Sequence, residues 1–242
     1  MAILPFMTDI LKTNAEYAGK MKSILKLRSE PVAVRLVREG EAYPKGLKAP
    51  DSQISHCQAV FRARKGECLS IPFEMTNCHV GAAVLGMTET PGKVASGEFH
   101  AGMGIHDSVG AAESMIKERI LIPYKTVGEA VCPLKDADFV PDAVIVIDIP
   151  ERIYWIVSMI TAEKGGRAEL STAPFQCACE DITAFPMVTG SPNISLGCFG
   201  CRKKTDMSAD ELACGMPYGL VPGYVARLER YSDGPIAKAK RD

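Results

Sequence analysis

The sequence predicts an α/β (α+β) fold built from two similar halves. Two short Val-rich runs, at 30–37 and 141–148, resemble each other. The stretches 59–86 and 158–190 then repeat one order: a helix ended by a Lys-Gly pair, a strand, a cysteine, a short helix and a glycine. Self-similarity of this length is typical of a repeated structural unit. We therefore expect a duplicated unit around mixed sheets, with the halves related by a pseudo-twofold axis. Convergent patterning of two unrelated α/β units is the alternative.

This pattern divides the chain into four parts. A chain of 242 residues can bury one substantial core, so the two halves are expected to form one compact domain. The predicted parts are an N-terminal helix at 1–28, a first half at 29–140, a second half at 141–232 and a tail at 233–242.

The elements of the first half follow from apolar spacing and from turn-forming residues. Apolar residues recur at helical spacing over 6–27, whereas 30–37 alternates as a strand does. Two prolines and two glycines predict a loop at 38–52. After it we expect, in order, a helix at 55–65, a strand at 68–73, a helix that begins near Cys78, a helix at 107–119 and irregular structure at 123–141.

The second half begins with the apolar run AVIVIDI at 143–149, which predicts a strand buried on both faces. A long apolar helix follows, with Tyr154 and Trp155 near its start as core residues. The segment 208–211 resembles a capping box, so a short helix is expected to begin there. Apolar spacing predicts a last helix at 217–231.

Composition narrows the class of protein. The net charge is -1 and charged residues make up 24% of the chain, so no global field favours nucleic acid. No run reaches the roughly 18 apolar residues that a membrane-spanning helix needs, and the N-terminus does not resemble a signal peptide. We therefore expect a cytoplasmic protein, and a homo-oligomer remains open. In a reducing compartment, nine cysteines indicate ligands or reactive thiols rather than disulfides.

Cysteines are densest within 176–202. Cys177 and Cys179 form a Cys-x-Cys pair, and Cys198 and Cys201 form a Cys-x-x-Cys pair. Thiolates ligate zinc, other soft metals and iron–sulfur clusters. Two alternatives stay open. The second pair could be a dithiol of thioredoxin type, which the polar loop expected directly after it disfavours, or the cysteines could be buried small hydrophobes.

Cysteines elsewhere extend this set. Cys78 and the pair Cys177 and Cys179 are predicted at equivalent helix starts in the two halves. Helix N-termini carry partial positive charge, which stabilises thiolates and anionic clusters. With Cys78 and one cysteine of that pair, Cys57 and Cys198 complete a set of four sulfurs.

Five segments carry a further resemblance: PVAVRLV, HCQAVFRARKG, CHVGAAVLGM, CPLKDADFVPDAVIVID and CACEDITAFPMVTGSPNISLGCFGCR. Together they resemble the uncharacterised archaeal and bacterial family catalogued as domain of unknown function 169, and NISLGCFGCR is the most specific piece. The resemblance implies a fold and a ligand set but no activity. The cysteines that it implies are Cys57, Cys78, Cys179 and Cys198, with Cys201 shared by close relatives. The cysteines outside this set, interpreted as packing residues, are Cys68, Cys132, Cys177 and Cys214.

Other polar residues near these cysteines are given structural interpretations. His56 and His79 each adjoin a favoured cysteine and are expected to hydrogen-bond or pack rather than to ligate. The Gly-rich segment 100–106 is interpreted as a surface loop, with a cover over a pocket or an anion cradle as the alternative. A solvated helix face is expected from Arg62, Arg64 and Lys65.

The predicted function is that of an iron–sulfur protein whose cluster, of the [4Fe-4S] type, is held by Cys57, Cys78, Cys179 and Cys198. Cys201 is a substitute or neighbour, and zinc is the alternative metal. The expected role is redox chemistry or small-molecule binding in anaerobic metabolism, with a small ligand or a redox partner. The alternative is a non-catalytic structural or sensor metalloprotein that binds zinc or a closed cluster. Whether the protein is an enzyme stays open.

Overall fold

Six strands form one antiparallel sheet in the computed structural model, which describes residues 7–163 and 165–239. The sheet order is β2-β3-β1-β4-β6-β5, and all the pairings are antiparallel. The predicted α/β class is therefore confirmed, whereas the expectation of several mixed sheets is wrong. The strands are β1 (Val32–Arg38), β2 (Leu69–Pro72), β3 (Thr126–Pro133), β4 (Ala143–Asp148), β5 (Asn193–Ser195) and β6 (Leu212–Pro217).

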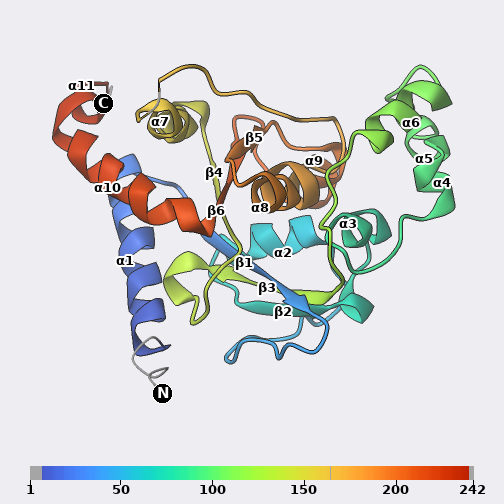
Figure 1. The fold of residues 1–242 in the computed structure, drawn as a ribbon, viewed down its shortest axis with the longest axis horizontal. Helices are drawn as coiled ribbons and strands as arrows, with labels where there is room; N and C mark the ends of the chain where they lie inside the picture. Colours follow the sequence, from blue (N-terminus) through green and yellow to red (C-terminus); the bar gives the residue numbers. More distant parts are fainter. Residues whose placement is uncertain (1–6, 164, 240–242) are drawn as a thin grey trace.

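Helices cover both faces of this sheet (Figure 1). The longer helices are α1 (Met7–Leu25), α2 (His56–Ala63), α6 (Val109–Lys117), α7 (Pro150–Thr161) and α10 (Val221–Tyr231). The shorter ones are α3 (His79–Val84), α4 (Gly92–Ala95), α5 (Glu98–Ala101), α8 (Phe185–Thr189), α9 (Phe199–Lys204) and α11 (Ala237–Ala239). A π-helical segment, η3 (Cys177–Ala184), runs into α8, and a second, η5 (Ser232–Ile236), follows α10. None of the helices within the described residues is long and apolar enough to cross a membrane.

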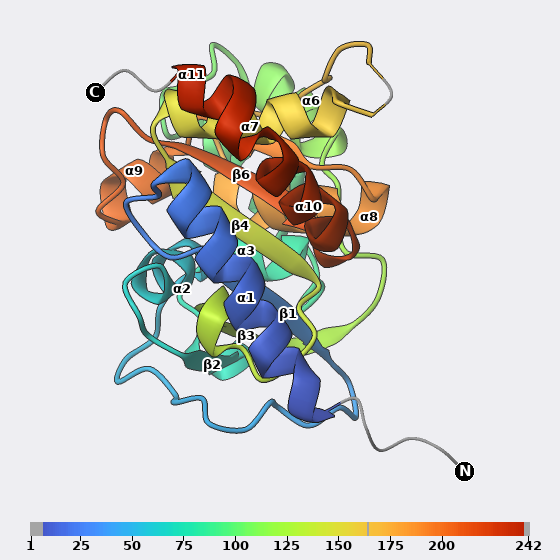
Figure 2. The same ribbon diagram turned by 90° about the vertical axis from the view of Figure 1, so that its left-hand side faces the viewer.

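The two faces of the sheet have separate cores. On one face, α1, α7 and α10 pack on the sheet, and Figure 2 shows α1 and α10 lying across the strands. On the other face lie α2, α3 and η3. Because side chains alternate along a strand, Val32 and Val34 of β1 face the α2 side while Ala33 faces the α1 side. Every residue of β4 is buried, which confirms the prediction of a strand covered on both faces.

Two strands occupy segments where the sequence predicts something else. Residues 123–141 are expected to be irregular, yet β3 lies there, between β1 and β2. Its apolar pattern is interrupted by Glu129, which is buried against His56. β6 replaces the short helix expected after Ser208, because the Ser208 backbone N–H donates to Glu211 within a turn and the chain then extends.

Two predicted core or tail assignments also differ from the fold. Trp155 is buried, as expected, but Tyr154 beside it on α7 is 60% exposed, because adjacent residues of a helix lie about 100° apart. The predicted tail at 233–242 begins helically in η5 and α11, and its Ile236 is buried in the α1-side core. The last three residues of that tail, and residues 1–6 of the predicted N-terminal helix, lie outside the described residues.

The strands of each predicted half are neighbours in the sheet. The first half contributes β2-β3-β1 and the second contributes β4-β6-β5, and the halves meet where β1 pairs with β4. In both halves the first strand pairs with the third, and the second strand is the outer one. The sequence repeat matches the strand at 68–73 with residues near 170, but the sheet does not follow this match. The described residues before η3 form no strand there, and β5 takes the outer place.

Candidate functional site

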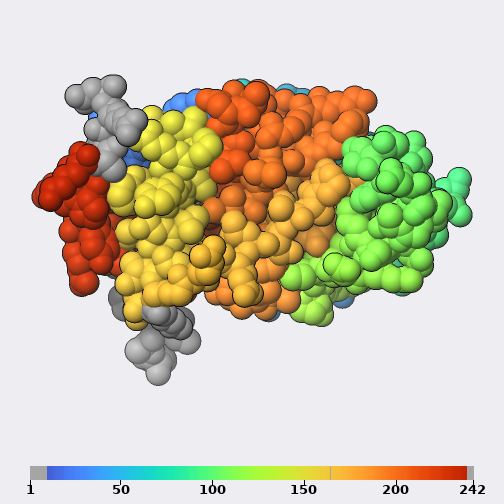
Figure 3. All heavy atoms as spheres, turned by 90° about the horizontal axis from the view of Figure 1, so that it is seen from above, coloured from blue at the N-terminus to red at the C-terminus, as the bar shows by residue number. Residues whose placement is uncertain are grey.

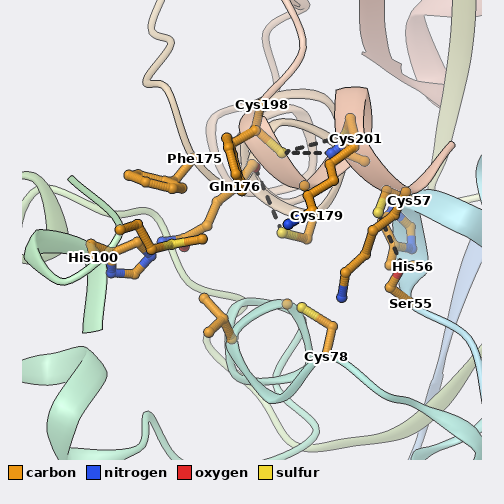
Figure 4. A pocket seen from close by; sticks show the side chains of 18 of the residues that line it. Ser55, His56, Cys57, Cys78, His100, Phe175, Gln176, Cys179, Cys198 and Cys201 are labelled. Carbon is orange, nitrogen blue, oxygen red and sulfur yellow. Dashed lines mark hydrogen bonds between the residues drawn. The ribbon is translucent and has the colours of Figure 1, made fainter. Parts of the chain in front are cut away.

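A cavity of about 240 Å³ lies on the α2 side of the sheet and opens to solvent. Five cysteines from four elements line this cavity, and their side chains are labelled around it in Figure 4. They are Cys57, Cys78, Cys179, Cys198 and Cys201. These are the four predicted ligands and the predicted neighbour, so the fold brings together residues that span more than half of the chain.

Cys57 is placed by the first turn of α2. Ser55 caps this helix, and the Gln58 side chain returns to the Ser55 backbone N–H, which completes a capping box. The Ser55 hydroxyl also lies 3.0 Å from the Cys57 sulfur. The Ser55 contact thus fixes the orientation of the Cys57 thiol. Because Cys57 is only half-buried, its thiol remains accessible from the cavity.

Cys78 and Cys198 hold the same position in two short helices. Cys78 is the N-cap residue of α3, which follows β2, and Cys198 is the N-cap residue of α9, which follows β5. The Cys198 sulfur accepts the backbone N–H of Cys201 over 3.4 Å. The expectation of a polar loop after Cys201 is therefore wrong, because residues 199–204 form a helix capped by a thiol.

Cys179 reaches the cavity from η3, and Cys78 lies on the opposite side (Figure 4). Gly81 borders both cysteines. A Cβ at Gly81 would lie 3.6 Å from the Cys78 sulfur and 3.6 Å from the Cys179 sulfur. Any side chain at this position would therefore occupy space that both thiols border. The absence of a side chain in the first turn of α3 keeps this part of the cavity open.

The thiols around α9 are hydrogen-bonded to one another. The Cys198 and Cys201 sulfurs lie 3.4 Å apart. Hydrogen bonding with the Cys201 side chain lowers the pKa of Cys198 to about 6 and the pKa of Cys57 to about 7. Hydrogen bonds with Cys177, Cys198 and Cys57 raise the pKa of Cys201. Cys198 and Cys57 are thus the thiols of this group that ionise first, and Cys201 is the thiol that keeps its proton longest.

On the other side of the cavity, burial raises the pKa of the cysteine thiols. It raises the pKa of Cys78, and it raises the pKa of Cys179 well above its usual value. Nearby thiolates raise both further. These two thiols therefore stay protonated at neutral pH until a cation compensates their charge.

Cysteines outside the predicted ligand set lie away from the cavity. Cys177 is 1% exposed and packs behind Cys201 in the α2-side core. The three others, packed on the α1 side of the sheet, are Cys68, Cys132 and Cys214. Their placement agrees with their interpretation as packing residues.

No group of three or more His, Cys, Asp or Glu side chains within residues 7–163 and 165–239 is arranged to hold a metal ion. A single zinc ion at about 2.3 Å from each sulfur would need its ligand sulfurs about 3.8 Å apart. The cysteines instead surround a cavity. Their sulfur donor set fits soft metals and iron–sulfur clusters, and the cavity leaves space between the donors.

The histidines beside the cysteines are held by structural contacts, as expected. His56 Nδ1 lies 2.5 Å from a Glu129 carboxylate oxygen, and its Nε2 lies 3.0 Å from the Thr183 hydroxyl. Burial opposes the charged imidazole, but the charge and hydrogen bond of Glu129 raise the pKa of His56 overall. His79 packs edge-on against Phe73.

Two further polar residues line the cavity, and one of them, His100, begins the Gly-rich segment 100–106, for which a cover over a pocket is the alternative interpretation. His100, expected in a surface loop, is 1% exposed on α5. Gln176 precedes η3 and has a left-handed backbone with φ 67°. The α4–α6 segment that carries His100 lies against the segment with η3 and α9 (green and orange in Figure 3). A long-range contact of this kind leaves no periodic signal in the sequence.

Comparisons with known proteins place the chain in a family. Residues 20–227 match the model of the family described as "Uncharacterised ArCR", domain of unknown function 169. The chain belongs to this family. The chain is also similar to "Uncharacterized protein MJ0308" of Methanocaldococcus jannaschii, with 26% identity over 218 residues, 89% of this chain and 94% of the relative. No solved structure matches the chain. The resemblance expected from the sequence is confirmed.

Proposed function

We propose that this member of the family is an iron–sulfur protein that holds a [4Fe-4S] cluster through Cys57, Cys78, Cys179 and Cys198. The supporting observation is that these cysteines, from four elements of the chain, line one cavity. Cysteines kept only for packing have no reason to point into a shared opening. The other cysteines lie behind Cys201 or on the far side of the sheet.

A cluster fits this cavity better than zinc, which remains the alternative metal. Zinc draws its ligands around one point, and structural zinc ligands are usually close in sequence. Here the donors border an opening of about 240 Å³ and come from distant segments. A cluster places several irons and sulfides between its thiolates and so needs such a space.

We also infer that the two halves are duplicated and related by a pseudo-twofold axis through the β1–β4 pair. Ala33 pairs with Val144, and the pairs Val32–Pro133 and Ala143–Pro217 hold the same register in their halves. The same relation matches α3 with α9, because each follows the outer strand. It therefore matches Cys78 with Cys198, and not with Cys177 or Cys179 as the sequence pattern indicates. The helix α2, which carries Cys57, is then matched with η3, which carries Cys179.

The expected role of the cluster is redox chemistry or small-molecule binding in an anaerobic, cytoplasmic setting. The cavity supports it because Cys57 and Cys78 are only partly buried, so a ligand or redox partner can approach. Lys203 and Lys204 also border the opening, where they favour an anionic centre. A closed cluster or zinc site with a structural or sensor role is the alternative, and it predicts that small molecules are excluded.

The test is anaerobic purification followed by iron and sulfide quantification and an absorption spectrum. We expect about four irons and four sulfides per chain. Replacing Cys57, Cys78, Cys179 or Cys198 singly by Ser should remove most of the iron. The matched controls Cys68→Ser and Cys132→Ser should retain it. If zinc replaces iron in the purified chain, or if the controls lose metal as readily, the cluster assignment is wrong.

A dithiol function is the second candidate, favoured by one observation. Cys198 and Cys201 lie 3.4 Å apart at the start of α9, and the pKa of Cys198 is lowered. These are features of a redox-active Cys-x-x-Cys pair. The variant Cys201→Ser separates the two functions. It abolishes dithiol chemistry, whereas a cluster held by the other four cysteines keeps its iron.

A further inference from the structure

His100 is a buried imidazole with an unused ring nitrogen. Its ring lies 4.6 Å from the Phe175 ring and 5.2 Å from the Phe99 ring, measured between centroids and with edge-on geometry. Its Nδ1 is buried and has no hydrogen-bond partner in the described part of the chain. Leaving such a nitrogen unpaired costs free energy, so the site is built for a group that is not part of the fold.

Two independent observations indicate that Gln176 is also built to bind a group that is not part of the fold. It is 6% exposed, and neither its Oε1 nor its Nε2 finds a partner among the described residues. It also adopts φ 67°, a region that non-glycine residues other than Asn and Asp rarely occupy. Strained backbone and unsatisfied polar atoms persist where surrounding structure holds them for a binding function.

The two residues share the cysteine-lined cavity. Both line it, and Figure 4 shows the Gln176 side chain extending from the cysteine side toward His100. Three phenylalanines supply apolar walls around them, and the Phe175 and Phe199 rings lie 6.4 Å apart. The cavity surface there comes from Phe99, Phe175 and Phe199.

We propose that Gln176 and His100 form a binding subsite for a flat aromatic molecule that presents a carboxamide or lactam edge. A side-chain amide needs one donor and one acceptor from its partner, and an adjacent N–H and C=O supply both. A carboxylate would satisfy only the Gln176 N–H group and would leave Oε1 unpaired. The aromatic body of the ligand lies against the phenylalanine walls, where offset and edge-on ring contacts are favourable.

This subsite does not rest on the proposed cluster. The buried polar atoms without a hydrogen-bond partner belong to Gln176 and His100. Neither residue is among the four cysteines proposed to hold the cluster. A ligand bound there would lie beside the thiols that line the same opening. If the cluster is present, the subsite orients a substrate or effector next to it. If iron is absent, the subsite still binds its ligand.

The experiment uses three probes with one ring: nicotinamide, nicotinate and pyridine. Ligand-observed NMR titration of the full chain as purified measures their dissociation constants. We expect nicotinamide to bind at least tenfold more tightly than the other two probes. Equal affinities, or binding of none of the three, would overturn the proposal and would indicate that water satisfies the orphaned atoms.

Gln176→Gly is the decisive variant because glycine accepts a left-handed backbone. It should reduce the preference for nicotinamide to less than twofold, while the thermal midpoint stays level or rises. Gln53→Ala, at an exposed glutamine that does not line the cavity, is the control and should retain the full preference. Unchanged nicotinamide selectivity in Gln176→Gly contradicts the subsite. If that chain does not fold, His100→Phe decides instead, with a tenfold loss of nicotinamide affinity expected and an unchanged affinity contradicting the proposal.

Discussion

The Cys198 sulfur lies 3.4 Å from the Cys201 sulfur and accepts the Cys201 backbone N–H. This distance exceeds the roughly 2.05 Å of a disulfide bond, so the two thiols are joined by a hydrogen bond. The pair has unequal acidity, because hydrogen bonds from the backbone and with Cys201 lower the pKa of Cys198, whereas hydrogen bonding with its neighbours raises the pKa of Cys201. The cavity therefore contains both a ready thiolate and a protonated neighbour.

Alkylation should follow this order of acidity. In the metal-free chain at pH 7, iodoacetamide should modify Cys198 and Cys57 first, because their pKa values are lowered to about 6 and about 7. Cys214 should react far more slowly, because burial raises its pKa to about 12. Peptide mass mapping over a time course gives the rates. Faster labelling of Cys214 than of Cys198 would contradict the thiolate assignment, and bound iron should protect Cys57 and Cys198.

His100 should make the stability depend on pH. Burial, followed by the charge of Arg119, lowers its pKa from 6.5 to about 4 in the folded chain. The unfolded chain therefore binds the proton at higher pH, and the free energy of unfolding falls as pH decreases from about 6.5 to about 4. The contribution is on the order of 2 kcal/mol.

Denaturant unfolding of the native chain and of His100→Phe at several pH values isolates this contribution. The variant should lose less stability than the native chain between pH 7 and pH 4, because it has no group to protonate at this position. His100→Gln, which also cannot titrate in this range, should reproduce the flatter profile if phenylalanine perturbs the packing. Parallel pH profiles for the native chain and both variants would show that folding does not lower the pKa of His100.

The sequence predicts which cysteines share the cavity better than it predicts the order of the sheet. The favoured cysteines converge as expected, and the helix start at Cys78 is predicted, whereas the helix that begins after Cys198 is not, because the polar residues that follow it predict a loop. β3 escapes prediction because Glu129 interrupts its apolar pattern, and only the distant His56 makes that buried carboxylate tolerable. Gln176 likewise gives no sequence signal, since its strain and its missing partners exist only in the folded chain.

Arg64 is expected on a solvated face but is 7% exposed, and its Nη1 donates to Glu211 over 2.8 Å. The pair ties the end of α2 to the turn before β6, and so joins the two halves. Glu211→Gln should lower the free energy of unfolding by about 2 kcal/mol, because it removes the buried counter-charge of the guanidinium and leaves only the more exposed Asp206 carboxylate, 3.1 Å from Nη2. Urea unfolding measures the change.

The exposed pair of Arg62 with Glu67 is the matched control on the same helix. Glu67→Gln should change the free energy of unfolding by no more than about 0.5 kcal/mol, since solvent screens exposed ion pairs. Equal losses in Glu67→Gln and Glu211→Gln would show that burial of the Arg64 pair has no energetic consequence.

Gly81 tests whether the space between Cys78 and Cys179 serves binding. In Gly81→Ala the new methyl carbon would lie 3.6 Å from each sulfur, which is ordinary van der Waals contact. Alanine also favours the helix over glycine by about 1 kcal/mol. The apo chain should therefore fold with equal or higher stability, while the methyl group fills space that a cluster needs.

Iron per chain, measured after anaerobic purification, should fall by more than half in Gly81→Ala and further in Gly81→Val. Gly19→Ala is the control: it lies in α1, where an added Cβ meets no described atom within 4 Å, so it gains helix stability and keeps its iron. Full iron content in both Gly81 variants would place the metal elsewhere. A stable Gly81→Ala chain without iron would instead show that the first turn of α3 is kept bare for the ligand rather than for the fold, because the same substitution in α1 has no such effect.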